Sequence, residues 1–111
     1  MANAAQRRYW TRIVALGCLI CGGPAEIAHC HGGSIAERGY TKAKGKKLRY
    51  MDWLVLPLCP RHGREPYPTG LDTNVERWER IYGSQVGHVC DLVTLTGVDV
   101  WALAVSPKVA A

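Results

Sequence analysis

The chain has 111 residues, a length typical of one domain, and we predict a single domain over residues 1–111. No stretch approaches the roughly 18 apolar residues that a membrane span requires, and the first residues lack the apolar core of a signal peptide. The five cysteines are an odd number and include a pair with metal-knuckle spacing, which favours a reducing compartment over a disulfide framework. We therefore expect a cytoplasmic protein with no membrane partner, whose oligomeric state the sequence does not predict.

The segment before the first cysteine pair has the pattern of an amphipathic helix. Tyr9, Ile13 and Leu16 recur at helical spacing, which predicts a helix over about residues 3–16. After a turn of small residues, we predict a short strand over residues 26–31. Residues 53–59 form an apolar run that predicts a second strand, whose ladder is limited by a proline.

The net charge of +5 is concentrated between these two predicted strands. Residues 32–47 are rich in Gly, Lys, Ser and Thr, which predicts a loop, and the basic part of this insertion extends to residue 49. Its six basic residues, with no acid among them, are Arg38, Lys42, Lys44, Lys46, Lys47 and Arg49. Such a cluster attracts polyanions, and a merely solvated loop is the alternative.

The C-terminal third of the chain is predicted to be helical. Thr73 and Glu76 have capping-box spacing and precede apolar residues on one side, which predicts a helix start. Residues 84–95 predict a second helix that Gly87 weakens, and residues 98–104 a last turn.

Two residue pairs separated by 37 residues have the composition of a zinc site. The four predicted ligands are Cys18, Cys21, Cys59 and His62. Thiolates and an imidazole suit tetrahedral zinc, and four protein ligands leave no position for a reacting water, so the predicted zinc is structural. Cys30 or Cys90 is an alternative fourth ligand, but neither belongs to a pair, and we leave both out of the predicted set.

Two further histidines lie between the cysteine pairs. If residues 26–31 form a strand, His29 and His31 point to the same face of it. Two imidazoles on one face, beside a metal knuckle and a basic loop, indicate a functional site more than a structural one.

These motifs together resemble a known family. The first cysteine pair, then Ala28-His29, then the run from Asp52 to His62, is similar to the zinc-bearing HNH (ββα-metal, His-Me finger) endonucleases of phages and prophages. It looks most like their recombination-enhancement nuclease group, over about residues 15–104. The resemblance implies an α+β fold: a small ββα-metal unit with flanking helices, stapled by the structural zinc.

The resemblance also implies an activity, the divalent-metal-dependent hydrolysis of DNA phosphodiester bonds, with Mg²⁺ or Mn²⁺ as the catalytic ion and a recombinase filament as a further partner. His29 matches the histidine that acts as general base, a role suited to an imidazole near neutral pH. The chain departs from the family at Ala28, where many relatives have Asp or His, and at Gly63, where many have a second histidine.

Three residues are candidate replacements for the missing catalytic-metal ligands: His31, Asp52 and Asp72. Each has a structural alternative, because Asp72 suits a helix N-cap, Asp52 a turn, and His31 a phosphate contact. The basic loop, together with Arg61 and Arg64, is expected to contact the DNA backbone.

Two other hypotheses remain open. The departures at Ala28 and Gly63 favour a catalytically degenerate, zinc-containing DNA-binding module that does not cleave. An interaction protein is the third hypothesis, and it would dock a partner through an exposed apolar patch that includes one of four tryptophans. These are Trp10, Trp53, Trp78 and Trp101.

Overall fold

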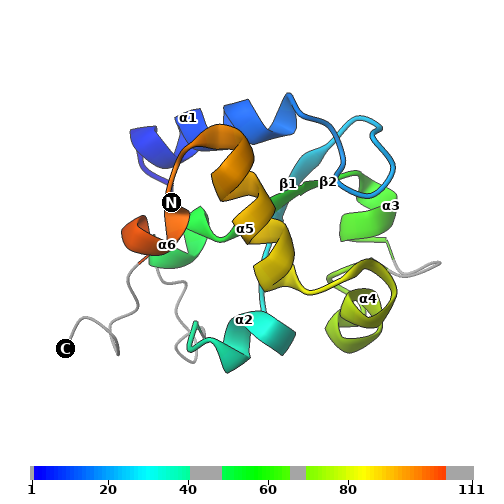
Figure 1. Ribbon diagram of the computed structural model, residues 1–111. Helices are drawn as coiled ribbons and strands as arrows, with labels where there is room; N and C mark the ends of the chain where they lie inside the picture. Colours follow the sequence, from blue (N-terminus) through cyan, green and yellow to red (C-terminus); the bar gives the residue numbers. More distant parts are fainter. Residues whose placement is uncertain (1, 41–48, 66–69, 105–111) are drawn as a thin grey trace.

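The computed structural model describes residues 2–40, 49–65 and 70–104, with the backbone alone for residues 49 and 50. Helices surround a two-stranded sheet, which confirms the α+β class (Figure 1). In chain order the elements are α1 (Ala4–Val14), β1 (Glu26–His29), α2 (Gly33–Glu37), the 3₁₀ helix η1 (Arg49–Trp53), β2 (Val55–Leu58), α3 (Pro60–Gly63), α4 (Val75–Tyr82), α5 (Gln85–Thr96) and α6 (Val100–Leu103). Within the described ranges, no helix combines the length and apolar character needed to cross a membrane.

The sheet is an antiparallel pair in which Glu26 lies opposite Leu58 and His29 opposite Val55. β2 is buried along its whole length, and both α1 and α5 pack against it (Figure 1). Both strands are shorter than predicted. The first ends at His29, because two glycines with positive φ, Gly32 at 62° and Gly33 at 45°, then turn the chain away from the sheet.

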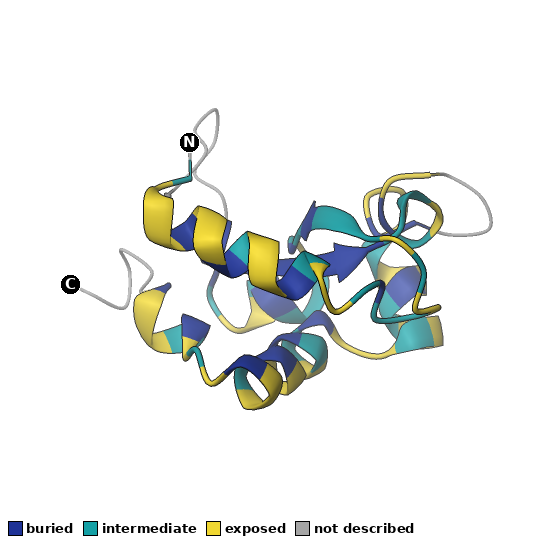
Figure 2. Ribbon diagram, turned by 90° about the horizontal axis from the view of Figure 1, so that it is seen from above, coloured by how far each residue is buried: buried dark blue, intermediate teal, exposed yellow. Residues whose placement is uncertain are grey.

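Helix α1 begins at a capping box. The Asn3 side chain accepts a hydrogen bond from the Gln6 N–H, and the Gln6 side chain accepts one from the Asn3 N–H, each at 2.8 Å. Tyr9 and Ile13 are buried against the sheet, whereas the outward side of the helix is exposed (Figure 2). Leu16, predicted on the apolar side, follows the end of the helix and is 49% exposed.

The predicted loop that begins at residue 32 contains a short helix, so this part of the prediction is wrong. Ile35 in α2 is fully buried. The Ser34 N–H donates to Glu79 of α4 at 3.0 Å, and the Ser34 hydroxyl accepts from the Val86 N–H of α5 at 3.1 Å. Ser34 thus anchors α2 to partners about fifty residues away, which composition does not reveal. The four lysines predicted to bind DNA lie outside the described residues.

The C-terminal helices follow the prediction, with one shifted boundary. Asn74, and not Thr73, caps α4, since the Asn74 side chain accepts from the Arg77 N–H at 3.0 Å. Helix α5 runs unbroken through Gly87, whose N–H donates to the Ser84 hydroxyl at 2.9 Å in the first turn. The predicted last turn is α6.

Candidate metal centre and catalytic site

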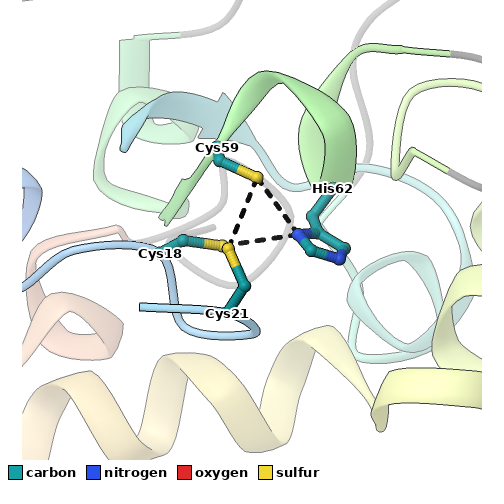
Figure 3. A group of neighbouring side chains, drawn as sticks. All are labelled: Cys18, Cys21, Cys59 and His62. Carbon is teal, nitrogen blue, oxygen red and sulfur yellow. Dashed lines mark hydrogen bonds between the residues drawn. The ribbon is translucent and has the colours of Figure 1, made fainter. Parts of the chain in front are cut away.

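The two predicted pairs meet in space, and the ligand atoms of Cys18, Cys21, Cys59 and His62 all lie within 4.8 Å of one another (Figure 3). The Cys21 and Cys59 sulfurs are 3.7 Å apart, as are the Cys18 sulfur and the His62 Nδ1 atom. Tetrahedral zinc with Zn–S bonds of about 2.3 Å requires sulfur–sulfur separations of about 3.8 Å. Both the donor set and the spacing therefore fit, and the group could hold a structural metal such as zinc.

The first knuckle is shaped by glycines and by backbone hydrogen bonds around Cys18. Gly17 has a φ of 85°, and a Cβ there would lie 3.0 Å from the Gly22 carbonyl oxygen. The Cys18 N–H donates to the Gly23 carbonyl and the Gly22 N–H to the Cys18 carbonyl, both at 2.8 Å. The Ile20 N–H donates to the Cys18 sulfur at 3.4 Å, a contact that favours the thiolate.

The second knuckle is the start of α3, which Cys59 precedes as the N-cap residue. The N–H groups of His62 and Gly63 donate to the Cys59 carbonyl at 3.1 and 2.9 Å. Helix α4 supports this turn from the other side. The Trp78 indole N–H donates to the His62 carbonyl at 2.8 Å, and the Tyr82 ring meets the imidazole edge-on with centroids 5.4 Å apart. The ligand histidine is thus fixed by two elements.

The protonation states of the ligand side chains are compatible with binding a metal cation. Burial and the neighbouring Arg61 lower the pKa of His62, so its ring is neutral near pH 7 and can ligate. At Cys18 burial opposes ionisation, but hydrogen bonds outweigh it and lower the pKa of the thiol. Burial, with the adjacent thiols, raises the pKa of Cys59. A bound metal deprotonates such a thiol, so metal affinity should fall with decreasing pH.

His29, the predicted general base, is paired with a buried carboxylate. Its Nε2 atom lies 2.8 Å from Oδ1 of Asp52, whose side chain is 1% exposed. Helix α1 completes the arrangement, because the Trp10 indole N–H donates to the Asp52 carbonyl at 2.8 Å and its ring meets the His29 ring edge-on. With Nε2 engaged, the Nδ1 atom of the partly exposed imidazole is left for chemistry.

His31 belongs to a second and more open pair. Its Nε2 atom lies 3.0 Å from Oδ1 of Asp72, and the two side chains are 34% and 51% exposed. Gln85, which is fully buried at the start of α5, holds the His31 backbone on both sides. Its side-chain oxygen accepts from the His31 N–H at 3.0 Å, and its amide nitrogen donates to the His31 carbonyl at 2.9 Å. The position of this histidine is therefore fixed while its ring remains accessible.

The four catalytic candidates thus form two His–Asp pairs. In the described part of the chain, the Cys₃His group is the one set of three or more donors close enough to share a metal ion. The buried and engaged Asp52 is suited to orienting His29, whereas the exposed Asp72 is free to face an ion together with His31. The alternative role of Asp72 as a helix cap is wrong, because Asn74 caps α4.

The two positions at which the chain departs from the HNH pattern are neighbours in space. Ala28 is 7% exposed and Gly63 is buried. A Cβ added at Gly63 would lie 3.6 Å from the Ala28 Cβ and 3.5 Å from that of Leu58. These two positions are therefore neighbours beside apolar carbon atoms, and neither side chain can ligate an ion.

Among the predicted DNA contacts, three arginines have described side chains. Arg64 donates to Glu26 through a 2.6 Å ion pair, and the Arg38 guanidinium lies 4.1 Å from the centroid of the Trp101 ring. Arg61 is exposed beside the second knuckle. Arg49 begins η1, and its side chain lies outside the described atoms.

Sequence reasoning missed two residues that hold the histidines. Trp10 was considered only as a docking residue, yet it contacts both members of the His29–Asp52 pair. Gln85 lies 54 residues from the histidine that it holds, and its sequence position gives no signal beyond following the α5 N-cap.

The chain was compared with family models, with curated proteins and with solved structures, and none of the three comparisons gave a match.

Proposed function

We propose that this protein is a divalent-metal-dependent DNA endonuclease of the zinc-bearing HNH type, acting in phage or prophage recombination. One observation carries the proposal. His29 ends the first strand of an antiparallel pair whose second strand leads into the Cys₃His group, and a buried carboxylate lies in hydrogen-bond contact with its ring. The Cys₃His group supports the proposal because it brings together the turn before β1 and the turn after β2.

In the proposed reaction, His29 Nδ1 accepts a proton from a water molecule as the water oxygen bonds to phosphorus. The bond from phosphorus to the leaving ester oxygen breaks, and that oxygen takes a proton from solvent. The negative charge of Asp52, 2.8 Å from Nε2, stabilises the imidazolium that forms. Afterwards the imidazolium releases its proton to solvent, which restores the base.

A divalent ion would supply Lewis acidity at the scissile phosphate. His31 and Asp72 are the residues that would hold it, since their donor atoms are 3.0 Å apart and both side chains are partly exposed. A nitrogen and a carboxylate oxygen suit Mn²⁺, and a pair of protein ligands leaves coordination positions for water and phosphate. The net charge of +5 would attract the DNA backbone.

Nicking of supercoiled plasmid tests the proposal. His29→Gln should lower the nicking rate about a hundredfold or more, because the general base is lost. His88→Gln is the matched control, since His88 lies in α5 and bonds to the Tyr82 carbonyl at 2.8 Å, a contact that glutamine can reproduce. Both variants should keep the parent's metal content and melting temperature. Equal nicking by the two variants would refute the role of His29.

A second candidate function is that of a DNA-binding module without cleavage. The neighbouring Ala28 and Gly63 favour it, because neither can ligate an ion through its side chain, whereas many HNH endonucleases have Asp or His at these positions. In that case the chain should bind DNA with an affinity that declines with salt, yet leave plasmid intact with magnesium, manganese, nickel or cobalt, with or without a recombinase filament.

A further inference from the structure

The turn that carries Asp72 is docked on the second metal knuckle. The Leu71 N–H donates to the His62 carbonyl at 3.0 Å, and the Asp72 N–H donates to the Gly63 carbonyl at 2.8 Å. The His62 carbonyl also accepts from the Trp78 indole N–H at 2.8 Å, so each of its two lone pairs can have a donor. Two consecutive amides therefore fix the Asp72 backbone relative to a ligand of the Cys₃His group.

Gly70 permits this close approach. It is buried, and a Cβ added there would lie 2.9 Å from the Gly63 carbonyl oxygen and would overlap the Glu65 carbonyl oxygen. Both obstacles are backbone atoms, which cannot rotate away as the end of a side chain can. Gly70 does not have a positive φ, so the steric overlap alone disfavours a larger residue. Its carbonyl accepts from the Thr73 N–H at 3.1 Å, which closes the turn.

The turn is anchored inside and presents one carboxylate outside. The Leu71 side chain is fully buried, and the Thr73 hydroxyl donates to the Glu65 carbonyl at 3.4 Å. Between these two residues, the Asp72 side chain is 51% exposed and meets the His31 ring at 3.0 Å. The position of this exposed carboxylate is therefore determined by the buried part of the same turn.

The two members of the His31–Asp72 pair are held by separate anchors. Gln85 of α5 holds the His31 backbone, whereas the second knuckle holds that of Asp72. The two residues are 41 positions apart in the sequence, so tertiary contacts alone set the distance between their donor atoms. A shift of either anchor would change the geometry of the pair directly.

We propose that Gly70 is a positioning residue for Asp72. Its lack of a side chain lets residues 70–73 dock on the second knuckle, so the Cys₃His group sets where the Asp72 carboxylate lies relative to His31. The inference rests on the proposed role of this pair in holding a divalent ion. Groups that orient a metal ligand typically change metal affinity about tenfold to a hundredfold. Loss of the docking should therefore weaken binding of the divalent ion without removing the zinc.

Broadening of the His31 ring signals by Mn²⁺, followed by NMR on the zinc-loaded full chain, tests the proposal. Asp72→Asn identifies the site and should need about tenfold more Mn²⁺ for equal broadening, because a carboxylate is the better ligand for this ion. Gly70→Ala should also need about tenfold more Mn²⁺, because the carboxylate is displaced. Elemental analysis should still find about one zinc per chain in both variants.

Gly97→Ala is the matched control. Gly97 has a φ of 74°, and a Cβ added there meets nothing within 4 Å. It caps the end of α5 opposite to Gln85. The positive φ lowers the stability of this variant, but the docked turn is untouched. Its Mn²⁺ dependence should therefore match that of the parent within about twofold, which separates positioning from a general loss of stability.

Amide hydrogen exchange in the parent tests the docking without any variant. The N–H groups of Leu71 and Asp72 should be protected to the same degree as those of His62 and Gly63, because one opening event exposes all four. Exchange of the Leu71 and Asp72 amides more than about tenfold faster than that of the knuckle amides would show that the turn is not docked, and the inference would be wrong.

Two results of the Mn²⁺ titration would also overturn the inference: equal Mn²⁺ dependence of Gly70→Ala and Gly97→Ala, or an Asp72→Asn variant that behaves like the parent. If Gly70→Ala loses its zinc, the exchange measurement decides. Loss of the nuclease proposal is a separate outcome. A parent that never nicks plasmid but shows these Mn²⁺ differences retains the positioning role of Gly70, whereas nicking without the differences removes that role alone.

Discussion

Replacing Asp52 by asparagine tests whether this carboxylate orients and stabilises the proposed base. Asparagine has nearly the same shape and can still accept the His29 Nε2 hydrogen across the 2.8 Å contact, but it has no charge. A hydrogen bond to a charged group contributes about 1.5–3 kcal/mol and a neutral one about 0.5–1.5 kcal/mol. The lost difference of about 1–2 kcal/mol, felt when the imidazolium forms, lowers the rate roughly fivefold to thirtyfold.

The assay is plasmid nicking under saturating and subsaturating DNA. The value of kcat should fall by this factor while KM is unchanged, because Asp52 is 1% exposed and does not reach DNA. The melting temperature should hold or rise, since the second carboxylate oxygen is buried without a partner among the described residues. In long-range ¹⁵N–¹H spectra of the parent, neutral His29 should carry its proton on Nε2. An unchanged kcat, or a proton on Nδ1, would refute the reasoning.

Three further perturbations test the fold around the site. Burial alone would raise the pKa of Glu79, but hydrogen bonds from Ser34 and Gln85 outweigh it and lower the pKa. The ionised Glu79 therefore stabilises the folded state above the ordinary carboxyl pKa, and this contribution is lost as pH falls through the lowered pKa. Chemical unfolding between about pH 6 and pH 2 should therefore depend less on pH in Glu79→Gln, and equal slopes would contradict this. Gly33→Ala should lower the melting temperature more than Gly39→Ala. Positive φ costs each variant about 1–2 kcal/mol, but the new Cβ would overlap the Glu79 side chain at residue 33 and meets nothing at residue 39. Cys59→Ser should melt far below the parent, and Cys90→Ser, at an exposed site, should melt like it; similar melting of both would speak against a metal at Cys59.

The metal group was predictable because its information is local. The two ligands of each pair lie within four consecutive residues, so the local turn alone brings them together. Glycines beside Cys18 indicate the tight turn that the first knuckle needs. The apolar run up to Cys59 likewise predicts a buried strand, and β2 is buried throughout. Helical periodicity puts Val75, Trp78 and Tyr82 on one side of the predicted helix, and Trp78 is fully buried.

What sequence could not predict depends on partners far along the chain. Helix α2 forms because Ser34 meets Glu79 and α5, contacts that span about fifty residues. The separation of the histidines into two pairs has the same origin, because Asp52 and Asp72 arrive from different segments. The alternating pattern also predicted that His29 and His31 lie on one strand. In the structure the strand ends at His29 because the chain turns at the following glycines, and the pattern does not predict this turn.

Zinc K-edge X-ray absorption on the purified protein, with elemental analysis, tests most directly whether one metal organises this fold. The account predicts about one zinc per chain, bound by three sulfurs at about 2.3 Å and one nitrogen at about 2.0–2.1 Å. The four ligand atoms already lie within 4.8 Å of one another, so only small side-chain shifts are required to bind the metal. Folded protein that contains no zinc, or zinc surrounded by oxygen ligands, would contradict the account.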